Sequence, residues 1–142
     1  MASSFKFIDH TADVAVDLEA DSLEELFSSA VEAFKISITD IECIEISDSI
    51  EIEITGASKE ELLVDFLNEI NFYVTTKKWL CCGIESIKVF NDENEWELSA
   101  EVNGIKLNSE KDLKQEIKSV TYHQMEIIAK NNMYSTRVVF DI

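Results

Sequence analysis

The sequence predicts an α+β fold, a two-layer sandwich in which two helices pack on one face of a mostly antiparallel (mixed) β-sheet. Two segments repeat apolar side chains at helical spacing, and several others alternate apolar with polar side chains as strands do. Their order is strand, helix, strand, helix and then consecutive strands. With no proline, three isolated glycines and no low-complexity stretch, we expect a single domain over residues 1–142.

A strand and a helix come first. In residues 13–19, valine and leucine alternate with acidic residues, which is the pattern of a half-buried strand. Ser22 and Glu25 have the spacing of a capping box, in which the serine oxygen accepts a hydrogen bond from the backbone N–H of the glutamate. The helix that they open has one apolar side, formed by Leu23, Leu26, Phe27, Ala30, Val31 and Phe34.

The second strand and helix repeat this pattern. Residues 50–54 alternate isoleucine with glutamate, and Ser58 with Glu61 forms a second capping box at the start of the longest helix. Its apolar positions fall within one wide arc: Leu62, Leu63, Phe66, Leu67, Ile70, Tyr73 and Val74. Phe72 lies roughly opposite this arc. Either this ring is exposed to a partner, or the helix is buried on two sides.

The remaining sequence predicts strands joined by turns. Residues 85–90 lead through the turn-forming "NDEN" to an alternating strand over residues 95–102. Residues 123–129, the turn "KNNM" and residues 134–142 predict a final hairpin.

The charge balance restricts the partners. There are 29 acidic and 12 basic residues, a formal net charge of −17. Nucleic-acid affinity rests largely on lysine and arginine pairing with phosphates, so we expect no strong direct binding of nucleic acid. A basic protein partner or a metal ion fits the sign of the charge, whereas solubility alone is the plainer explanation of the acidic surplus.

The expected location is cytoplasmic, with no membrane association. No apolar run approaches the ~18 residues of a membrane-spanning helix, and "MASSFKF" contains no apolar segment of signal-peptide length. Three cysteines, with Cys81 and Cys82 adjacent, suit neither a disulfide framework nor a zinc site. A reducing cytosol is therefore the simplest home, and inert packing is favoured over a reactive thiol.

Familiar enzyme signatures are missing, so we expect no catalytic residues. Isolated glycines form no phosphate-binding loop, and no serine lies in a nucleophile elbow that would suit His10 or His123. For His123, a structural, hydrogen-bonded histidine is favoured over a base.

The two ends of the chain carry the strongest candidate for a site. Asp13 begins one predicted strand, and Asp141 ends the last one on the side opposite its apolar face. If these strands are antiparallel neighbours, the two carboxylates converge. Paired carboxylates are hard oxygen ligands suited to Ca²⁺, Mg²⁺ or Mn²⁺. The alternative is that Asp13 only caps the start of its strand.

Five segments together resemble the archease family: "DHTADVAV", "SLEELFSSAVEAF", "EELLVDFLNEINFYV", "EIKSVTYHQMEI" and "RVVFDI". They occur in order and with family-like spacing from about residue 5 to residue 142. The resemblance implies a small, non-catalytic protein cofactor of tRNA splicing. Such a protein activates the RtcB-type RNA ligase by promoting its guanylylation and multiple turnover, while GTP and Mn²⁺ belong to the ligase.

The resemblance also implies roles for particular residues. It assigns a divalent metal site, with calcium as the expected ion and Mn²⁺ or Mg²⁺ as alternatives, to Asp13, Asp141 and the main-chain oxygen of Ile142. The residues expected to act on the partner are Lys118, His10 and His123. The alternatives are a chaperone-like modulator of a tRNA-modifying enzyme such as a tRNA methyltransferase, or a small metal-dependent phosphohydrolase that uses the same two aspartates.

Overall fold

The computed structural model describes residues 3–9, 13–46, 48–109, 112–121 and 125–142. Their helices and strands are, in order, β1 (Ser3–Asp9), β2 (Asp13–Ala20), α1 (Leu23–Ile38), β3 (Asp48–Gly56), α2 (Lys59–Lys77), β4 (Trp79–Asp92), β5 (Glu95–Lys106), β6 (Ser119–Thr121), β7 (Ile128–Lys130) and β8 (Met133–Asp141). The predicted α+β class with two helices is confirmed.

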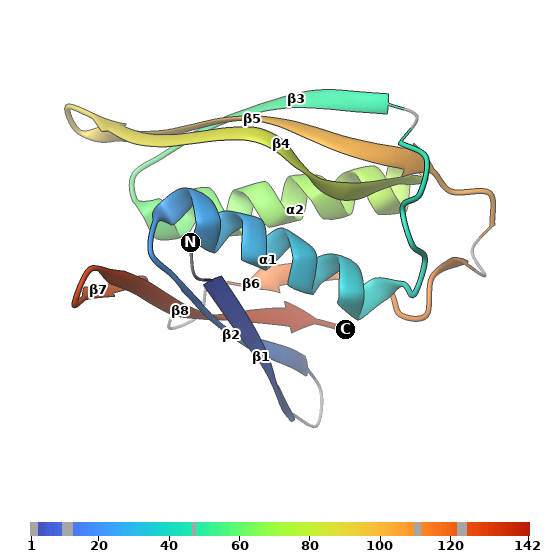
Figure 1. The fold of residues 1–142 in the computed structure, drawn as a ribbon, viewed down its shortest axis with the longest axis horizontal. Coiled ribbons are helices and arrows are strands. Elements are labelled where there is room, and N and C mark those ends of the chain that lie inside the picture. The colour runs from blue at the N-terminus through green and yellow to red at the C-terminus, as the bar shows by residue number, and fades with distance from the viewer. Residues whose placement is uncertain (1–2, 10–12, 47, 110–111, 122–124) are drawn as a thin grey trace.

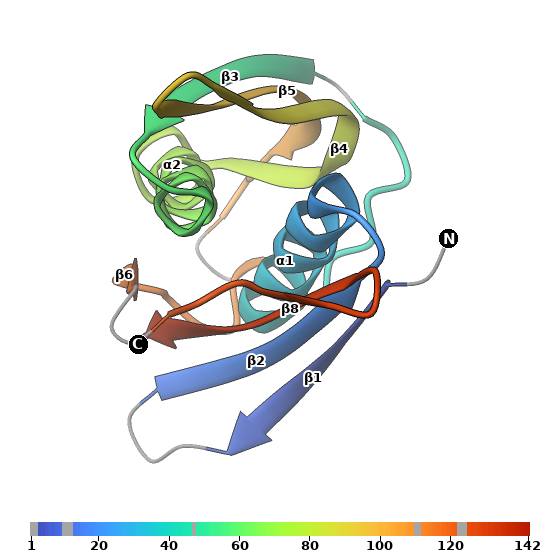
Figure 2. The ribbon, with the colours of Figure 1, turned by 90° about the vertical axis from the view of Figure 1, so that its left-hand side faces the viewer.

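The strands form two sheets rather than the single sheet that we expected. One has the order β1-β2-β8-β6, with β7 also paired to β8, and the other has the order β3-β5-β4. Figures 1 and 2 show the helices between the two sheets, so the domain has three layers rather than two. Every pairing between the described strands is antiparallel, so neither sheet is mixed.

The long helix explains why two sheets are needed. The buried residues of α2 include Leu62, Val64, Leu67 and Asn71, which spread around the helix, and α2 contacts both β3 and β6. A helix with so wide an apolar surface must be covered from more than one side. The helix is covered on two sides, as one interpretation of Phe72 expected, and the Phe72 side chain is nevertheless 44 % exposed. Contact of this ring with a partner stays a prediction.

Local signals set the ends of the elements. Ser22 Oγ accepts a hydrogen bond from the Glu25 backbone N–H at 3.1 Å, and Ser58 Oγ accepts one from Glu61 at the same distance. Both predicted helix starts are thus confirmed. Consecutive asparagines, 131 and 132, turn the chain between β7 and β8 with φ values of 54° and 63°, a left-handed conformation that asparagine tolerates.

The core fills the space between the sheets and joins both helices to them. The rings of Phe27 on α1 and Phe66 on α2 stack with centroids 6.4 Å apart. Phe34, also on α1, meets Phe140 of β8 edge-on at 5.6 Å. All four side chains are almost completely buried, so β8, which ends at Asp141, is fixed from its helix-facing side.

The cysteines are a correction to the sequence reasoning. Cys43, in the segment after α1, forms a disulfide with Cys82 of β4, with their Cα atoms 6.0 Å apart. The 39-residue separation gave no local signal of this contact. Cys81 is a free, buried thiol, and desolvation raises its pKa to about 12, which keeps it in the unreactive protonated form.

None of the described helices is long and apolar enough to cross a membrane.

Candidate functional site

Asp13 and Asp141 are direct partners across the pairing of β2 with β8. Directly opposite residues in a sheet share a face, so the two carboxylates lie side by side. On the other side of β8, Ser119 of β6 is also paired with Asp141, which gives one row of polar residues across three strands. The adjoining row contains the buried Phe140 and Val120 and faces the core, so the polar row lies on the outer face. Figure 2 shows the helices on only one side of this sheet.

The two carboxylates have no compensating charge in the described structure. Both residues are half-buried, and the described residues form neither an ion pair nor a hydrogen bond with either side chain. Like charges directly opposite each other on neighbouring strands destabilise a sheet. Asp13 and Asp141 therefore form a position where a cation would stabilise the fold.

Four residues further along β2, the same face shows the opposite arrangement. Asp17 is paired with Arg137 of β8, whose Nε and Nη2 donate to the two carboxylate oxygens at 2.6 and 3.0 Å. The Arg137 guanidinium holds the pKa of the Asp17 carboxyl below its ordinary value. Asp17 thus has a positive partner in a bidentate ion pair, whereas no described cation lies beside Asp13.

The donor set fits a hard divalent cation. Carboxylate oxygens suit Ca²⁺, Mg²⁺ and Mn²⁺, which take six or more oxygen ligands. No cluster of three or more His, Cys, Asp or Glu side chains able to hold a metal occurs among the described residues. The remaining ligands of an ion held by Asp13 and Asp141 would thus be water molecules and main-chain oxygens, such as that of the adjoining Ile142. The carbonyl of Asp141 itself already accepts a hydrogen bond from the backbone N–H of Lys118.

Lys118 lies next to this carboxylate row. Its backbone N–H donates to the Asp141 carbonyl at 2.7 Å, its side chain is exposed, and it directly precedes β6. The structure therefore brings together three of the predicted site residues, with Ile142 immediately beside them. His10 and His123 fall outside the described residues, so their predicted contact with the partner stays a prediction.

Two asparagines of α2 hold the chain on either side of Lys118. The buried Asn71 donates from Nδ2 to the carbonyl of Ile117 at 2.8 Å. Asn68 makes two hydrogen bonds with the backbone of Val120: its Nδ2 donates to the carbonyl at 3.0 Å, and its Oδ1 accepts from the N–H at 2.8 Å. Sequence reasoning missed both residues, although two amides three positions apart within an apolar helix are a usable signal.

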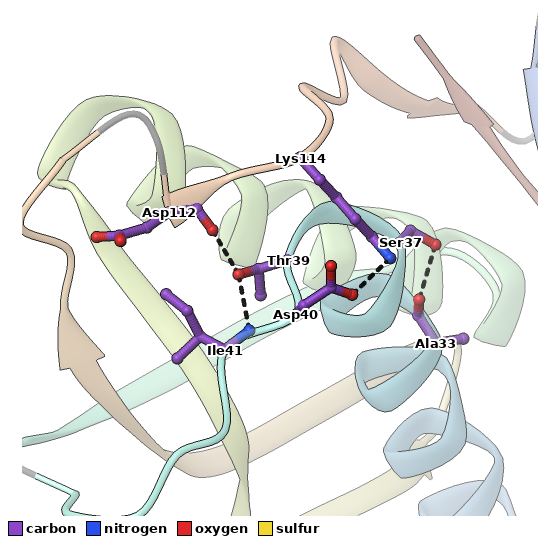
Figure 3. Close-up of polar contacts among 7 residues, drawn as sticks. All are labelled: Ala33, Ser37, Thr39, Asp40, Ile41, Asp112 and Lys114. Atoms are coloured by element: carbon purple, nitrogen blue, oxygen red, sulfur yellow. Dashed lines mark hydrogen bonds and ion pairs between the residues drawn. The ribbon is translucent and has the colours of Figure 1, made fainter.

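The segment leading to Lys118 is also fastened to the end of α1 (Figure 3). Lys114 donates from its backbone N–H to Ile38 at 2.7 Å, and its Nζ forms an ion pair with Asp40 at 3.0 Å. Thr39 Oγ1 donates to the carbonyl of Asp112 at 2.5 Å. Although this segment has little regular secondary structure, contacts with both helices place Lys118 in advance of any partner.

Comparison with known proteins gives one consistent result. The model of the Archease protein family (MTH1598/TM1083) matches residues 5–142. The chain is 35 % identical to protein archease of Sulfolobus acidocaldarius, covering 97 % of this chain and 98 % of the relative. It is 31 % identical to protein archease-like of Drosophila melanogaster, covering 97 % and 90 % of the two chains.

Solved structures agree with the fold. The solution structure of Methanobacterium thermoautotrophicum protein 1598 superposes with a TM-score of 0.81 at 27 % identity, covering 97 % of this chain and 98 % of the other. A Thermotoga maritima protein, described as an archease and possible chaperone, has a TM-score of 0.55 at 24 % identity and covers 96 % of both chains. The second likeness supports the fold alone.

Proposed function

Because this chain belongs to the archease family, we propose that it is a non-catalytic activator of the RtcB-type RNA ligase in tRNA splicing. In this proposal it promotes guanylylation of the ligase and its multiple turnover. The observation that carries the proposal is that Asp13 and Asp141 lie in one row across β2, β8 and β6, with Lys118 next to that row. All three are positioned by contacts that need no partner.

The chemistry of these groups suits a nucleotide bound by the partner. Asp13 and Asp141, with the main-chain oxygen of Ile142, would hold a divalent cation, with Ca²⁺ expected and Mg²⁺ or Mn²⁺ as alternatives. Such an ion supplies positive charge for phosphate oxygens. Lys118 presents a second, mobile point charge on an anchored backbone, which is how lysine commonly meets phosphate. GTP and the catalytic Mn²⁺ remain those of the ligase.

The proposed partner surface is basic. The proposed location is the cytoplasm, which now rests on the proposed role alone, because the Cys43–Cys82 disulfide removes the argument from unpaired cysteines. A protein with net charge −17 is steered towards positive surfaces and repelled by free tRNA. A chaperone-like role towards a tRNA methyltransferase is the second candidate. The observation that favours it is that two exposed apolar side chains, Phe7 and Ile36, line the same hollow and form an apolar contact surface.

A guanylylation assay with and without this protein tests the proposal. The wild type should stimulate the ligase, whereas Asp13→Asn, Asp141→Asn and Lys118→Ala should reduce stimulation while the protein stays folded. Asp17→Asn is the matched control, since it changes an aspartate on the same face that already has a counter-charge. Turnover of GTP or a phosphate ester without added ligase would favour the phosphohydrolase and overturn the proposal.

A further inference from the structure

A hollow of about 560 Å³ lies between β3 and one side of α2. Its lining consists of Glu53, Ile54, Asp65, Asn68, Glu69 and Phe72. The four residues contributed by α2 are spaced three, four and seven positions from the first, so they form one continuous face of the helix. Figure 2 shows α2 end-on, with β3 above it and β6 below it.

The hollow runs along an unpaired edge of a sheet. β3 is terminal in the order β3-β5-β4, so one of its edges pairs with no described strand. Consecutive residues of a strand point to opposite faces, yet both Glu53 and Ile54 line the hollow. The hollow therefore reaches β3 from its side, where free backbone N–H and C=O groups can pair with an incoming strand.

The charge of this groove, by which we mean the hollow and the adjoining edge of β3, has one sign. Glu53, Asp65 and Glu69 contribute three carboxylates, and the lining contains no lysine or arginine. No ion pair or hydrogen bond compensates these three side chains within the described residues. Burial and the nearby Glu61 carboxylate raise the pKa of Asp65, as expected where negative charges crowd together.

Phe72 adds an apolar contact to this acidic groove. Its side chain is 44 % exposed, and it meets the ring of Tyr73 edge-on at 5.8 Å. Aromatic side chains are enriched among the residues that dominate binding energy at protein interfaces. An occupant that satisfies the whole groove must therefore carry both positive charge and an apolar side chain.

We propose that the groove binds an extended basic segment of another protein, which adds as a strand to the edge of β3. Its lysine or arginine side chains meet Glu53, Asp65 and Glu69, and an apolar side chain covers Phe72. Strand addition draws affinity from main-chain hydrogen bonds and specificity from such side-chain contacts. The proposal requires neither the cation site nor the RNA ligase, so it stands or fails separately from the proposed function.

The competing explanation gives Phe72 no part. Charged residues on an edge strand often serve only to prevent edge-to-edge aggregation. In that case a basic peptide would be attracted to the acidic surface in general, and neither the Phe72 ring nor the main-chain edge of β3 would affect its affinity.

A synthetic peptide of about ten lysine and valine residues, a typical strand length, is a suitable probe if both residue types occur on each face of the strand, because Asp65, Glu69 and Phe72 share one face of α2. One control peptide replaces lysine with glutamate, and another carries N-methyl groups that remove main-chain donors while keeping charge and side chains. Binding is measured by calorimetry, and the bound surface by amide shifts of ¹⁵N-labelled protein. We expect shifts confined to β3 and the facing side of α2, and binding of neither control peptide at that site.

Protein variants complete the experiment. Phe72→Ala, and separately the pair Glu53→Gln with Glu69→Gln, should each weaken binding by about tenfold. Phe90→Ala is the matched control, because Phe90 is a phenylalanine of β4 with a similar exposed fraction of 41 %, and it should leave binding unchanged. Thermal unfolding verifies that each variant is folded.

Four results would overturn the proposal. These are equal affinity for wild type and Phe72→Ala, equal affinity for the N-methylated peptide, shifts spread over the acidic surface, or no binding up to about 1 mM. If the double variant Glu53→Gln with Glu69→Gln self-associates while its peptide affinity is unchanged, the acidic residues serve only to prevent edge-to-edge aggregation.

Discussion

Two positions on the outer face of the β1-β2-β8-β6 sheet differ in how negative charge is compensated. Asp17 of β2 faces Arg137 of β8, and two short hydrogen bonds join them. Asp13 of the same β2 faces Asp141 of the same β8, and no described cation meets either carboxylate. The same two strands therefore carry a neutralised pair at one position and facing like charges four residues away.

This difference shows where the acidic character of the chain is informative. Solubility requires carboxylates on the surface, but it does not require two half-buried carboxylates in register with each other. The total charge of −17 thus suggests a partner only loosely. The Asp13–Asp141 position, which has no counter-charge among the described residues, suggests a cation at a defined place, because a single positive ion would offset the repulsion between the two carboxylates.

The largest expected effect is a metal-dependent gain in stability at the Asp13 end alone. Calcium at about one hundred times its dissociation constant should stabilise the wild type by about 2.7 kcal/mol, because a ligand that binds only the folded state shifts the folding equilibrium by mass action in proportion to the logarithm of its concentration over Kd. Asp13→Asn and Asp141→Asn should each abolish this shift in Tm. Calorimetry with Ca²⁺, Mg²⁺ and Mn²⁺ measures the same loss as an absent binding heat.

Asp17→Asn provides the control for this experiment, because it removes a carboxylate whose charge Arg137 already compensates. It should leave the metal-induced shift unchanged. Unchanged ion binding in Asp13→Asn or in Asp141→Asn would eliminate the shared site.

The next largest effect concerns the asparagines that hold Lys118 at the Asp13 end. Asn71→Ala leaves the Ile117 carbonyl without its buried donor, which should cost about 1–3 kcal/mol of unfolding free energy. Stimulation of the ligase should fall with it, because the backbone beside Lys118 loses an anchor. Denaturant unfolding and the guanylylation assay give the two readouts.

Lys118→Ala is the matched variant for that prediction. It should lose stimulation and keep its stability, since Lys118 is exposed and substitutions at such positions seldom change stability by much. If Lys118→Ala instead unfolds the protein, the lysine is a structural counter-charge and its proposed role is wrong.

These positions also show what the sequence could and could not predict. Local patterns were sufficient for the helix starts at Ser22 and Ser58, since a capping box depends on residues three positions apart. Alternation placed Asp13 at the start of one strand and Asp141 at the end of another, but their convergence depended on these strands being antiparallel neighbours, which is the pairing that the structure has. That these two aspartates hold an ion stays a prediction.

Features that depend on distant contacts were missed. Alternation shows which face of a strand is apolar but not which strand lies beside it, so the division into two sheets was not predicted. β1 was overlooked although its signal is local, since Phe5 and Phe7 alternate with polar residues and β2, its partner, follows directly in the chain. The Cys43–Cys82 disulfide and the grip of Asn68 on Val120 join segments 39 and 52 residues apart, beyond the range of any local pattern.

A smaller effect should follow from introducing a positive charge next to the facing carboxylates of Asp13 and Asp141. Ser119 is the β6 partner of Asp141, so Ser119→Arg places a guanidinium in the same row, as Arg137 does for Asp17. The metal-free protein should gain about 0.2–1 kcal/mol, the usual range for an opposite-charge pair across strands. The metal-induced shift in Tm should shrink, whereas Ser119→Gln should change neither quantity. An undiminished metal response would show that Asp141 is not an ion ligand.

The smallest expected effect is the pH dependence of the compensated position. Because Arg137 holds the pKa of Asp17 below its ordinary value of 3.8, the unfolded chain binds this proton more readily than the folded one. The contribution of the pair is therefore fully present above about pH 4 and is lost as the pH falls through the lowered pKa. Asp17→Asn should be destabilising near neutral pH and nearly neutral in acid. Added salt should reduce the difference, since both side chains are partly exposed.

Asp65 gives the comparison of opposite sign. Burial and Glu61 raise the pKa of its carboxyl, so the folded chain binds this proton more readily, and the ionised group opposes folding at neutral pH. Asp65→Asn should therefore stabilise the protein above the raised pKa and have little effect below the ordinary one. Denaturant unfolding of both variants from about pH 2 to pH 7 should give differences of opposite sign, and each should shrink towards zero as the pH falls below both pKa values of its aspartate. Differences that do not change with pH would mean that packing rather than charge determines the effect of each aspartate.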